Sequence, residues 1–229
     1  MHPAIPTRAR PAGTRLLPTD IAWVETRTER AYVDLFAIEE HVVSGYAPAR
    51  RAEFATGRAC AREALASLGL PSAAIPPGPA GDPVWPDAVV GSITHCAGYR
   101  AAAVALASSY SSIGIDAEPH LAVPPEVLVA VASPVELVDL EALPADGTAW
   151  DRVLFSAKES AYKGWFPLLS GEILATDIVV RLHPAGEFGA SISGTVMRGR
   201  WDVTDGLVRT AVWISSDRVI APCRPTHLP

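Results

Sequence analysis

The sequence of 229 residues has few cysteines, and their spacing matches no common metal or disulfide framework. The three cysteines are Cys60, Cys96 and Cys223, an odd number with no CxxC pair among them. This pattern disfavours both a disulfide scaffold and a structural zinc site. Because unpaired thiols are typical of a reducing compartment, we expect a cytoplasmic protein.

Long apolar runs and an excess of basic charge are also lacking. The longest clean apolar run, 101–107, is far shorter than the roughly 20 residues that cross a bilayer. The N-terminus carries Arg8, Arg10 and Arg15 among prolines with no apolar segment after them, so we expect a loose arm rather than a secretory signal. A formal net charge of −6 disfavours a general nucleic-acid binder, since such proteins need a basic face.

The apolar content of 49% is enough to form a core, and the hydrophobic pattern predicts both helices and strands. The stretch 75–86 is rich in proline and predicts an irregular loop. Helices and strands do not alternate regularly, which predicts an α+β fold, and we find no internal sequence repeat. We expect helices at 29–43, 48–68, 126–140 and 150–168, strands at 16–26, 89–94, 101–107, 113–118, 173–182, 188–192, 199–203 and 207–214, and an unstructured end after 220.

Two acids end the apolar segment Ile113-Gly114-Ile115-Asp116-Ala117-Glu118. Alternate residues of a strand point to the same face, so Asp116 and Glu118 are predicted to lie side by side. Two neighbouring carboxylates repel unless a cation or a basic group lies between them. The segment predicts a metal site, although two solvent-exposed acids at a strand end would give the same pattern.

A third acid lies in the predicted helix that contains Phe155-Ser156-Ala157-Lys158-Glu159-Ser160-Ala161-Tyr162-Lys163. Glu159 and Lys163 are four residues apart and therefore neighbours on a helix, beside the aromatic side chains of Phe155 and Tyr162. An ordinary surface ion pair would also explain this spacing.

A strand that runs into a polar turn carries Thr94 and His95, in the segment Val90 to Gly98. The Thr94 hydroxyl, His95 and nearby backbone amides could bind a phosphate group. A structural role for the histidine stays open. A metal pair of His95 and Cys96 is disfavoured, since adjacent residues of a strand point to opposite faces.

The predicted helix at 48–68 carries an arginine-rich segment, Arg50 to Arg62. At about 100° per residue, Arg51, Arg58 and Arg62 fall within a sector of roughly 40°. A stripe of guanidinium groups is suited to anions, while solubility of the surface is the other explanation.

Together these four segments resemble the Sfp-type 4'-phosphopantetheinyl transferases. The matching residues are Gly91 to His95, Gly114 to Glu118 and the Phe-Ser-x-Lys-Glu-Ser-x-x-Lys run from Phe155 to Lys163. The Trp85-Pro86 loop before Gly91 is also similar to members of this class. The resemblance implies two pseudo-symmetric α+β halves, 1–109 and 110–229, which form one functional unit with the active site between them.

The resemblance also implies a reaction. The phosphopantetheine arm of coenzyme A would move to a serine of an apo acyl or peptidyl carrier protein, with release of 3',5'-ADP, as in holo-acyl-carrier-protein synthases. It implies Mg²⁺, with Mn²⁺ as second choice, a monomer, and carrier domains of fatty acid, polyketide or nonribosomal peptide synthases as partners. The residues that it assigns are Asp116, Glu118 and Glu159 for the metal, Glu159, Lys163 and His95 for catalysis, and Arg50, Arg58, Thr94, His95 and Lys163 for coenzyme A.

One departure from the family concerns the loop before the histidine motif. Some members carry a lysine for the 3'-phosphate there, where this chain has Pro77 and Asp82. Because carrier proteins tend to be acidic, we expect their docking to need local arginines, such as Arg8, Arg15 or Arg27. Two other functions stay open: a noncatalytic module that binds coenzyme A or a carrier protein, and another Mg²⁺-dependent phosphotransferase, which the lack of a GxxxxGK[ST] loop disfavours.

Overall fold

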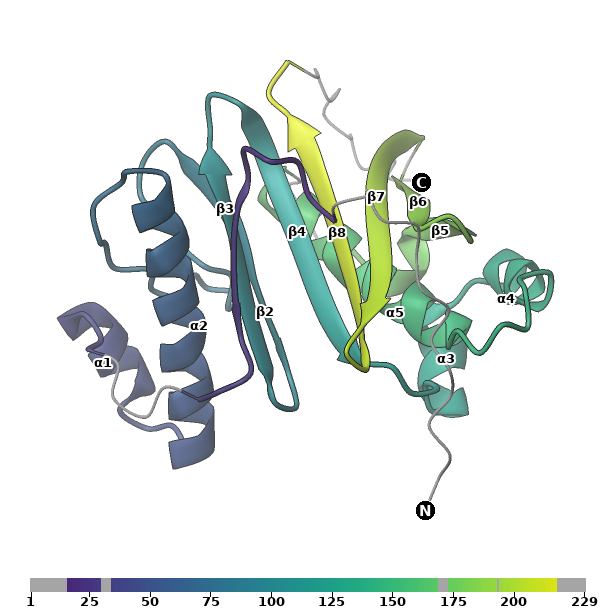
Figure 1. The fold of residues 1–229 in the computed structure, drawn as a ribbon, viewed down its shortest axis with the longest axis horizontal. Coiled ribbons are helices and arrows are strands. Elements are labelled where there is room, and N and C mark those ends of the chain that lie inside the picture. The colour runs from purple at the N-terminus through teal and green to yellow at the C-terminus, as the bar shows by residue number, and fades with distance from the viewer. Residues whose placement is uncertain (1–15, 30–33, 169–172, 193, 218–229) are drawn as a thin grey trace, which may run out of the picture.

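The computed structural model describes residues 16–29, 34–168, 173–192 and 194–217. Two antiparallel sheets lie next to each other, and a long helix covers each of them (Figure 1). In chain order the elements are β1 (Ala22–Thr26), α1 (Ala37–Val43), α2 (Pro48–Ser67), β2 (Val89–Cys96), β3 (Tyr99–Leu106), β4 (Tyr110–Pro119), α3 (Pro125–Val131), α4 (Pro134–Glu141), α5 (Trp150–Trp165), β5 (Val179–His183), β6 (Glu187–Ile192), β7 (Thr195–Thr204) and β8 (Leu207–Ser215), with 3₁₀ turns at Phe166–Leu168 and Ala175–Asp177.

The strand order of the first sheet recurs in part of the second. The first sheet has the order β1-β3-β2 and the second the order β4-β8-β7-β6-β5. In each, the first strand pairs with the last strand of its half, which pairs in turn with the strand before it. The long helices α2 and α5 occupy matching places in chain order. The predicted α+β fold of two pseudo-symmetric halves is confirmed, although the sequence itself shows no repeat.

The two sheets meet where β2 lies alongside β4. The contact uses side-chain hydroxyls of β2 in place of a backbone ladder. The Ile115 amide donates to Ser92 Oγ (3.1 Å) and the Ala117 amide to Thr94 Oγ1 (3.2 Å). Buried backbone amides need such partners, so Ser92 and Thr94 satisfy the edge of β4.

Strand β3 is buried on both of its faces, which explains the continuous apolar run at 101–107. Ala102 and Val104 pack with Cys60 and Ala61 of α2. The intervening alanines pack in the core between the sheets, together with Ile113 and other residues of β4 and β8. Small side chains allow the two sheets to approach closely.

Helix α5 lies directly on β4, because a glycine leaves room for it. A Cβ atom added at Gly114 would lie 1.9 Å from the Ser160 carbonyl oxygen and 2.5 Å from the Gly164 amide nitrogen. The Ser112 hydroxyl donates a hydrogen bond to the Gly164 carbonyl in the same contact. This close approach places the helix residues Glu159 and Lys163 over β4.

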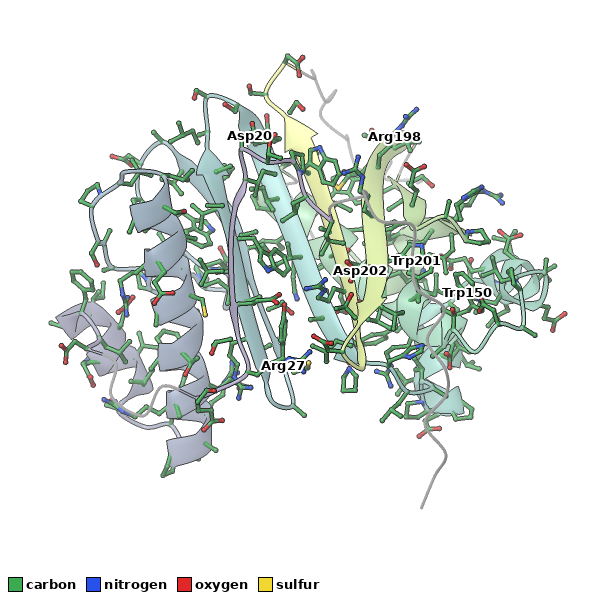
Figure 2. The ribbon with its side chains drawn as sticks, viewed as in Figure 1. Asp20, Arg27, Trp150, Arg198, Trp201 and Asp202 are labelled. Carbon is green, nitrogen blue, oxygen red and sulfur yellow. The ribbon has the colours of Figure 1, made fainter. Side chains whose placement is uncertain are left out.

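The beginning of α5 is fixed by an aromatic pair. Trp150 and Trp201 of β7, both labelled in Figure 2, make an edge-to-face contact with centroids 5.0 Å apart at 76°. Next to Trp201, Asp202 accepts two hydrogen bonds from Arg209 of β8, at 2.9 and 3.0 Å. These contacts tie α5 to the second sheet.

One predicted helix is wrong as a single element. The segment 126–140 forms two helices, α3 and α4, which break before Pro134. Proline lacks an amide hydrogen and is favoured at the first turn of a helix. Ser133 caps α4, because its hydroxyl accepts from the Glu136 amide while Glu136 accepts from the Ser133 amide.

Other boundaries differ from the predictions by shorter lengths. Within the described residues, α1 begins only at Ala37, β1 at Ala22 and β5 at Val179, each later than predicted. The predicted N-terminal arm and the end after 220 lie outside the described residues. In the part of the chain that the structure describes, no helix is both long and apolar enough to span a membrane.

We predict that Gly114→Ala destabilises the protein by about 3 kcal/mol or more, because the new methyl group would push α5 off β4. Urea denaturation followed by circular dichroism measures the change. Gly45→Ala is the matched control, since nothing lies within 4 Å of the methyl group that it adds. Equal unfolding midpoints for Gly114→Ala and the wild type would contradict the tight contact.

Candidate active site

A cavity of about 580 Å³ opens where the two halves meet. Its walls come from the loop before β2, from β2 itself, from the end of β4 and from α5 with the turn after it. Residues on both sides of position 110 therefore form one hollow. Six predicted site residues line it: Thr94, His95, Asp116, Glu118, Glu159 and Lys163.

Asp116 is the most buried of the acids that line this cavity, with 4% of its surface exposed. Its carboxylate accepts hydrogen bonds from Thr94 Oγ1 (3.1 Å), Ser156 Oγ (2.8 Å) and Lys163 Nζ (2.7 Å). These donors compensate for burial of the charge. Ser156 is not among the predicted site residues. The spacing Ser156, Glu159 and Lys163 places all three on one face of α5 and was the available signal.

Glu118 is held by an arginine that the sequence analysis also missed. Arg152 Nη1 donates to Glu118 Oε2 (3.1 Å), and the same guanidinium donates to the carbonyls of Leu121 (2.9 Å) and Ala122 (3.1 Å). Burial and then the Asp116 charge raise the pKa of Glu118 to about 7, while Arg152 opposes the rise. Arg152 thus connects α5 to the segment after β4.

Glu159 completes a crowded group of acids. Burial and then Asp116 raise its pKa, and Lys163 opposes this. Within the described ranges, no three His, Cys, Asp or Glu side chains are close enough to hold a metal ion as they stand. Instead the Lys163 ammonium provides the positive charge beside Asp116.

A smaller cavity of about 150 Å³ adjoins the first and has a basic lining that includes Arg50, Arg58 and His95. His95 Nδ1 lies 3.0 Å from Glu53 Oε1, and its Nε2 lies 3.1 Å from Arg50 Nη1. Burial lowers the pKa of His95, an effect that Glu53 opposes. The smaller cavity can therefore attract an anion.

Arg58 is 7% exposed, which is unusual for an arginine. Its Nε donates to the Ile75 carbonyl (2.8 Å), and its guanidinium carbon lies 4.0 Å from the centroid of the Phe54 ring. Burial lowers the pKa of Arg58 to about 10, so the group keeps its charge at pH 7.

Two arginines of the predicted stripe form ion pairs with α1. Arg51 contacts Glu40 (2.7 Å) and Arg62 contacts the buried Glu39 (3.0 Å), so both hold α1 against α2. Neither lines the two cavities. Arg50 and Arg58, which our helical projection did not place on one stripe, both line the smaller cavity.

The loop that departs from the family borders both cavities. Pro77 lines the smaller cavity and Asp82 the larger one. The Gly78 amide donates to the Asp82 carbonyl (2.7 Å), and Pro77 and Pro83 form an isolated bridge that closes the loop.

Of the arginines expected to help carrier docking, Arg27 pairs with Asp205 at 3.7 Å. Arg8 and Arg15 lie outside the described residues.

Three acids and a lysine in one cavity, next to a basic cavity, define a site suited to a phosphorylated ligand and a hard cation. The chain belongs to the 4'-phosphopantetheinyl transferase superfamily. Residues 38–105 match the model of the 4'-phosphopantetheinyl transferase N-terminal domain, and residues 112–223 match that of the 4'-phosphopantetheinyl transferase superfamily. The predicted family is therefore confirmed.

Curated relatives agree with this assignment. The chain is 40% identical over 208 residues to 4'-phosphopantetheinyl transferase PptT of Mycobacterium tuberculosis, covering 84% of this chain and 92% of the relative. It is 43% identical over 210 residues to 4'-phosphopantetheinyl transferase Svp of Streptomyces mobaraensis, covering 82% and 85%. It is 39% identical over 193 residues to 4'-phosphopantetheinyl transferase Npt of Nocardia iowensis, covering 76% and 86%.

The pKa of the Cys96 thiol depends on the charge of the site. Burial and then Glu118 and Asp116 raise the pKa of its thiol to about 11. We predict that iodoacetamide alkylates Cys96 at pH 8 on the order of 100-fold more slowly than a small free thiol, because the thiolate is scarce. Glu118→Gln should speed alkylation, since it removes a negative charge, while the exposed Glu126→Gln should not. Mass spectrometry of the Cys96 peptide measures the rates, and equal rates in all three proteins would contradict the assigned cause.

Proposed function

We propose that this protein moves the phosphopantetheine arm of coenzyme A to a serine of an apo carrier protein and releases 3',5'-ADP. Membership of the transferase family supports the reaction. The observation that carries the proposal is the set Asp116, Glu159 and Lys163 gathered in one cavity. A noncatalytic binding module would have no need of this complete set.

In the proposed reaction the serine hydroxyl attacks the β-phosphorus of coenzyme A. A new phosphorus–oxygen bond forms, the bond to the bridging oxygen of the pyrophosphate breaks, and 3',5'-ADP leaves with the electron pair. Glu159 lines the cavity and accepts the serine proton, directly or through water. Lys163 contacts the transferred phosphate and balances its charge.

Mg²⁺ fits the donors of the site, with Mn²⁺ as second choice. Asp116, Glu118 and Glu159 provide only carboxylate oxygens, which hard cations prefer. Burial raises the pKa values of Glu118 and Glu159, and the charge of Asp116 raises them further. A cation would relieve the repulsion from Asp116. The ion would stabilise the negative charge on the phosphates of coenzyme A.

The basic cavity is proposed to hold the other phosphates of coenzyme A. Arg50, Arg58 and His95 line it, and arginine binds phosphate through two parallel hydrogen bonds. The proposed contribution of Thr94 to coenzyme A binding is indirect, because its hydroxyl already bonds Asp116 and the Ala117 amide. We propose that the halves 1–109 and 110–229 act as one unit, with the substrate between them.

The partners are proposed to be acyl or peptidyl carrier domains of fatty acid, polyketide or nonribosomal peptide synthases. Because the site lies between the halves of one chain, a monomer would suffice, and we propose a cytoplasmic enzyme. The role of local arginines in carrier docking stays a prediction. Another Mg²⁺-dependent phosphotransferase or a nucleotide hydrolase would turn over a nucleotide without a carrier, which a nucleotide-turnover assay without carrier tests.

We expect intact-mass spectrometry to show that an apo carrier protein, incubated with this protein, coenzyme A and Mg²⁺, gains one phosphopantetheine group. The double variant Asp116→Ala plus Glu159→Ala and the addition of EDTA should each abolish the gain. Circular dichroism checks that the variant is folded. Coenzyme A binding without any gain across several acyl and peptidyl carriers would favour the noncatalytic module.

Metal binding can be measured without catalysis. Mg²⁺ bound at the acids would lower the pKa of Cys96, so we expect Mg²⁺ to speed alkylation of Cys96 at pH 8. Sodium chloride of equal ionic strength should have a smaller effect. The double variant Asp116→Asn plus Glu159→Gln should lose the acceleration. An alkylation rate that does not depend on Mg²⁺ in the wild type would argue against the metal site.

A further inference from the structure

Glu53 of α2 lies among three basic side chains beside the smaller cavity. Its Oε1 is 3.0 Å from His95 Nδ1 and 3.6 Å from Arg100 Nη2, and its Oε2 accepts from Arg50. The side chain is only 19% exposed. Neither the sequence motifs nor the proposed reaction gives this carboxylate a role.

The contacts fix which nitrogen of His95 carries the proton. An ionised carboxylate only accepts hydrogen bonds, so Nδ1 must donate to Glu53. A guanidinium only donates, so Nε2 must accept from Arg50. We therefore assign a neutral imidazole with its hydrogen on Nδ1. The lowered pKa of His95, caused first by burial, agrees with this assignment.

A phosphate oxygen cannot bind Nε2 in that state, because both atoms are acceptors. Nε2 can donate to a phosphate only after it gains a proton, while Nδ1 still donates to Glu53. The charges that face His95 are Arg50 and Glu53 from α2, Arg100 from β3 and Lys163 from α5. Among them only Glu53 favours the imidazolium, and a phosphate would add a second favourable charge.

We propose that Glu53 is the positioning residue of His95, which holds Nδ1 so that Nε2 takes up a proton from solvent and donates it in a hydrogen bond to a phosphate of coenzyme A. This inference rests on coenzyme A as the ligand of the proposed function. Arg50, whose side chain is half exposed, is free to turn from Nε2 toward the same phosphate. Binding of coenzyme A is thus coupled to protonation of His95.

Glu53→Gln tests the inference, because glutamine keeps the shape and the acceptor oxygen but loses the charge. At pH 7 we expect its Kd and KM for coenzyme A to rise about five- to ten-fold, with kcat changed less than about two-fold. Calorimetry of coenzyme A binding in buffers of different ionisation enthalpy should show proton uptake in the wild type and its loss in the variant. Glu40→Gln is the matched control, since it breaks the Arg51 ion pair away from both cavities.

A double variant separates positioning from general stability. In the His95→Ala background, Glu53→Gln should have no further effect on coenzyme A binding. If Glu53 only stabilised the fold, Glu53→Gln would weaken coenzyme A binding further in that background. Unchanged affinity and unchanged proton uptake in Glu53→Gln would overturn the inference even if the wild type modifies carriers. Glu53-dependent proton uptake without transfer to any carrier would overturn the proposed function alone. A wild-type protein that does not bind coenzyme A would overturn both.

Discussion

The buried carboxylate of Asp116 is the group on which the site most depends. It receives hydrogen bonds from Thr94 of one half and from Ser156 and Lys163 of the other. A buried charge is stable only with such partners, so correct placement of β2, β4 and α5 is a condition for burying it. The glycine contact at Gly114 makes this geometry possible, since it brings α5 within bonding distance of β4. The site therefore requires the packing of both halves against each other.

A protein with a net charge of −6 can still bind a polyanion if its cationic groups are concentrated locally. The structure separates the two signs across adjoining cavities, with acids around Asp116 and arginines around His95. In the proposed function the acidic end, around Asp116, and the basic end, around His95, bind phosphate in different ways. The acidic end needs a divalent cation to hold phosphate, whereas the basic end binds phosphate directly. Lys163, beside Asp116, is the cation that already serves the acidic end.

The sequence predicted elements and motifs whose signal lies within one segment. The helix at 48–68 and the paired acids of β4 follow from local spacing, and the six predicted residues that line the larger cavity do meet there. The sequence could not show partners from distant segments, such as Arg152 for Glu118 or Glu53 for His95. The prediction of an anion-binding stripe was wrong for Arg51 and Arg62 for the same reason, because the carboxylates of α1 that bind them belong to another helix. Arg58 of the same stripe does line the smaller cavity. Pro134 marks the break between α3 and α4 in the sequence, but the apolar pattern runs through it and favours one helix.

The missing loop lysine can be understood from the burial of Arg58. Pro77 carries no charge and Asp82 adds a negative one, so the loop offers a phosphate no cation at these two positions. Arg58 has already lost most of its water, which lowers its pKa to about 10. A desolvated cation interacts more strongly with an anion than an exposed lysine does, since the local dielectric is lower. An anion in the smaller cavity would offset the cost of that burial. The proposed 3'-phosphate is therefore expected to lie against α2 rather than against the loop.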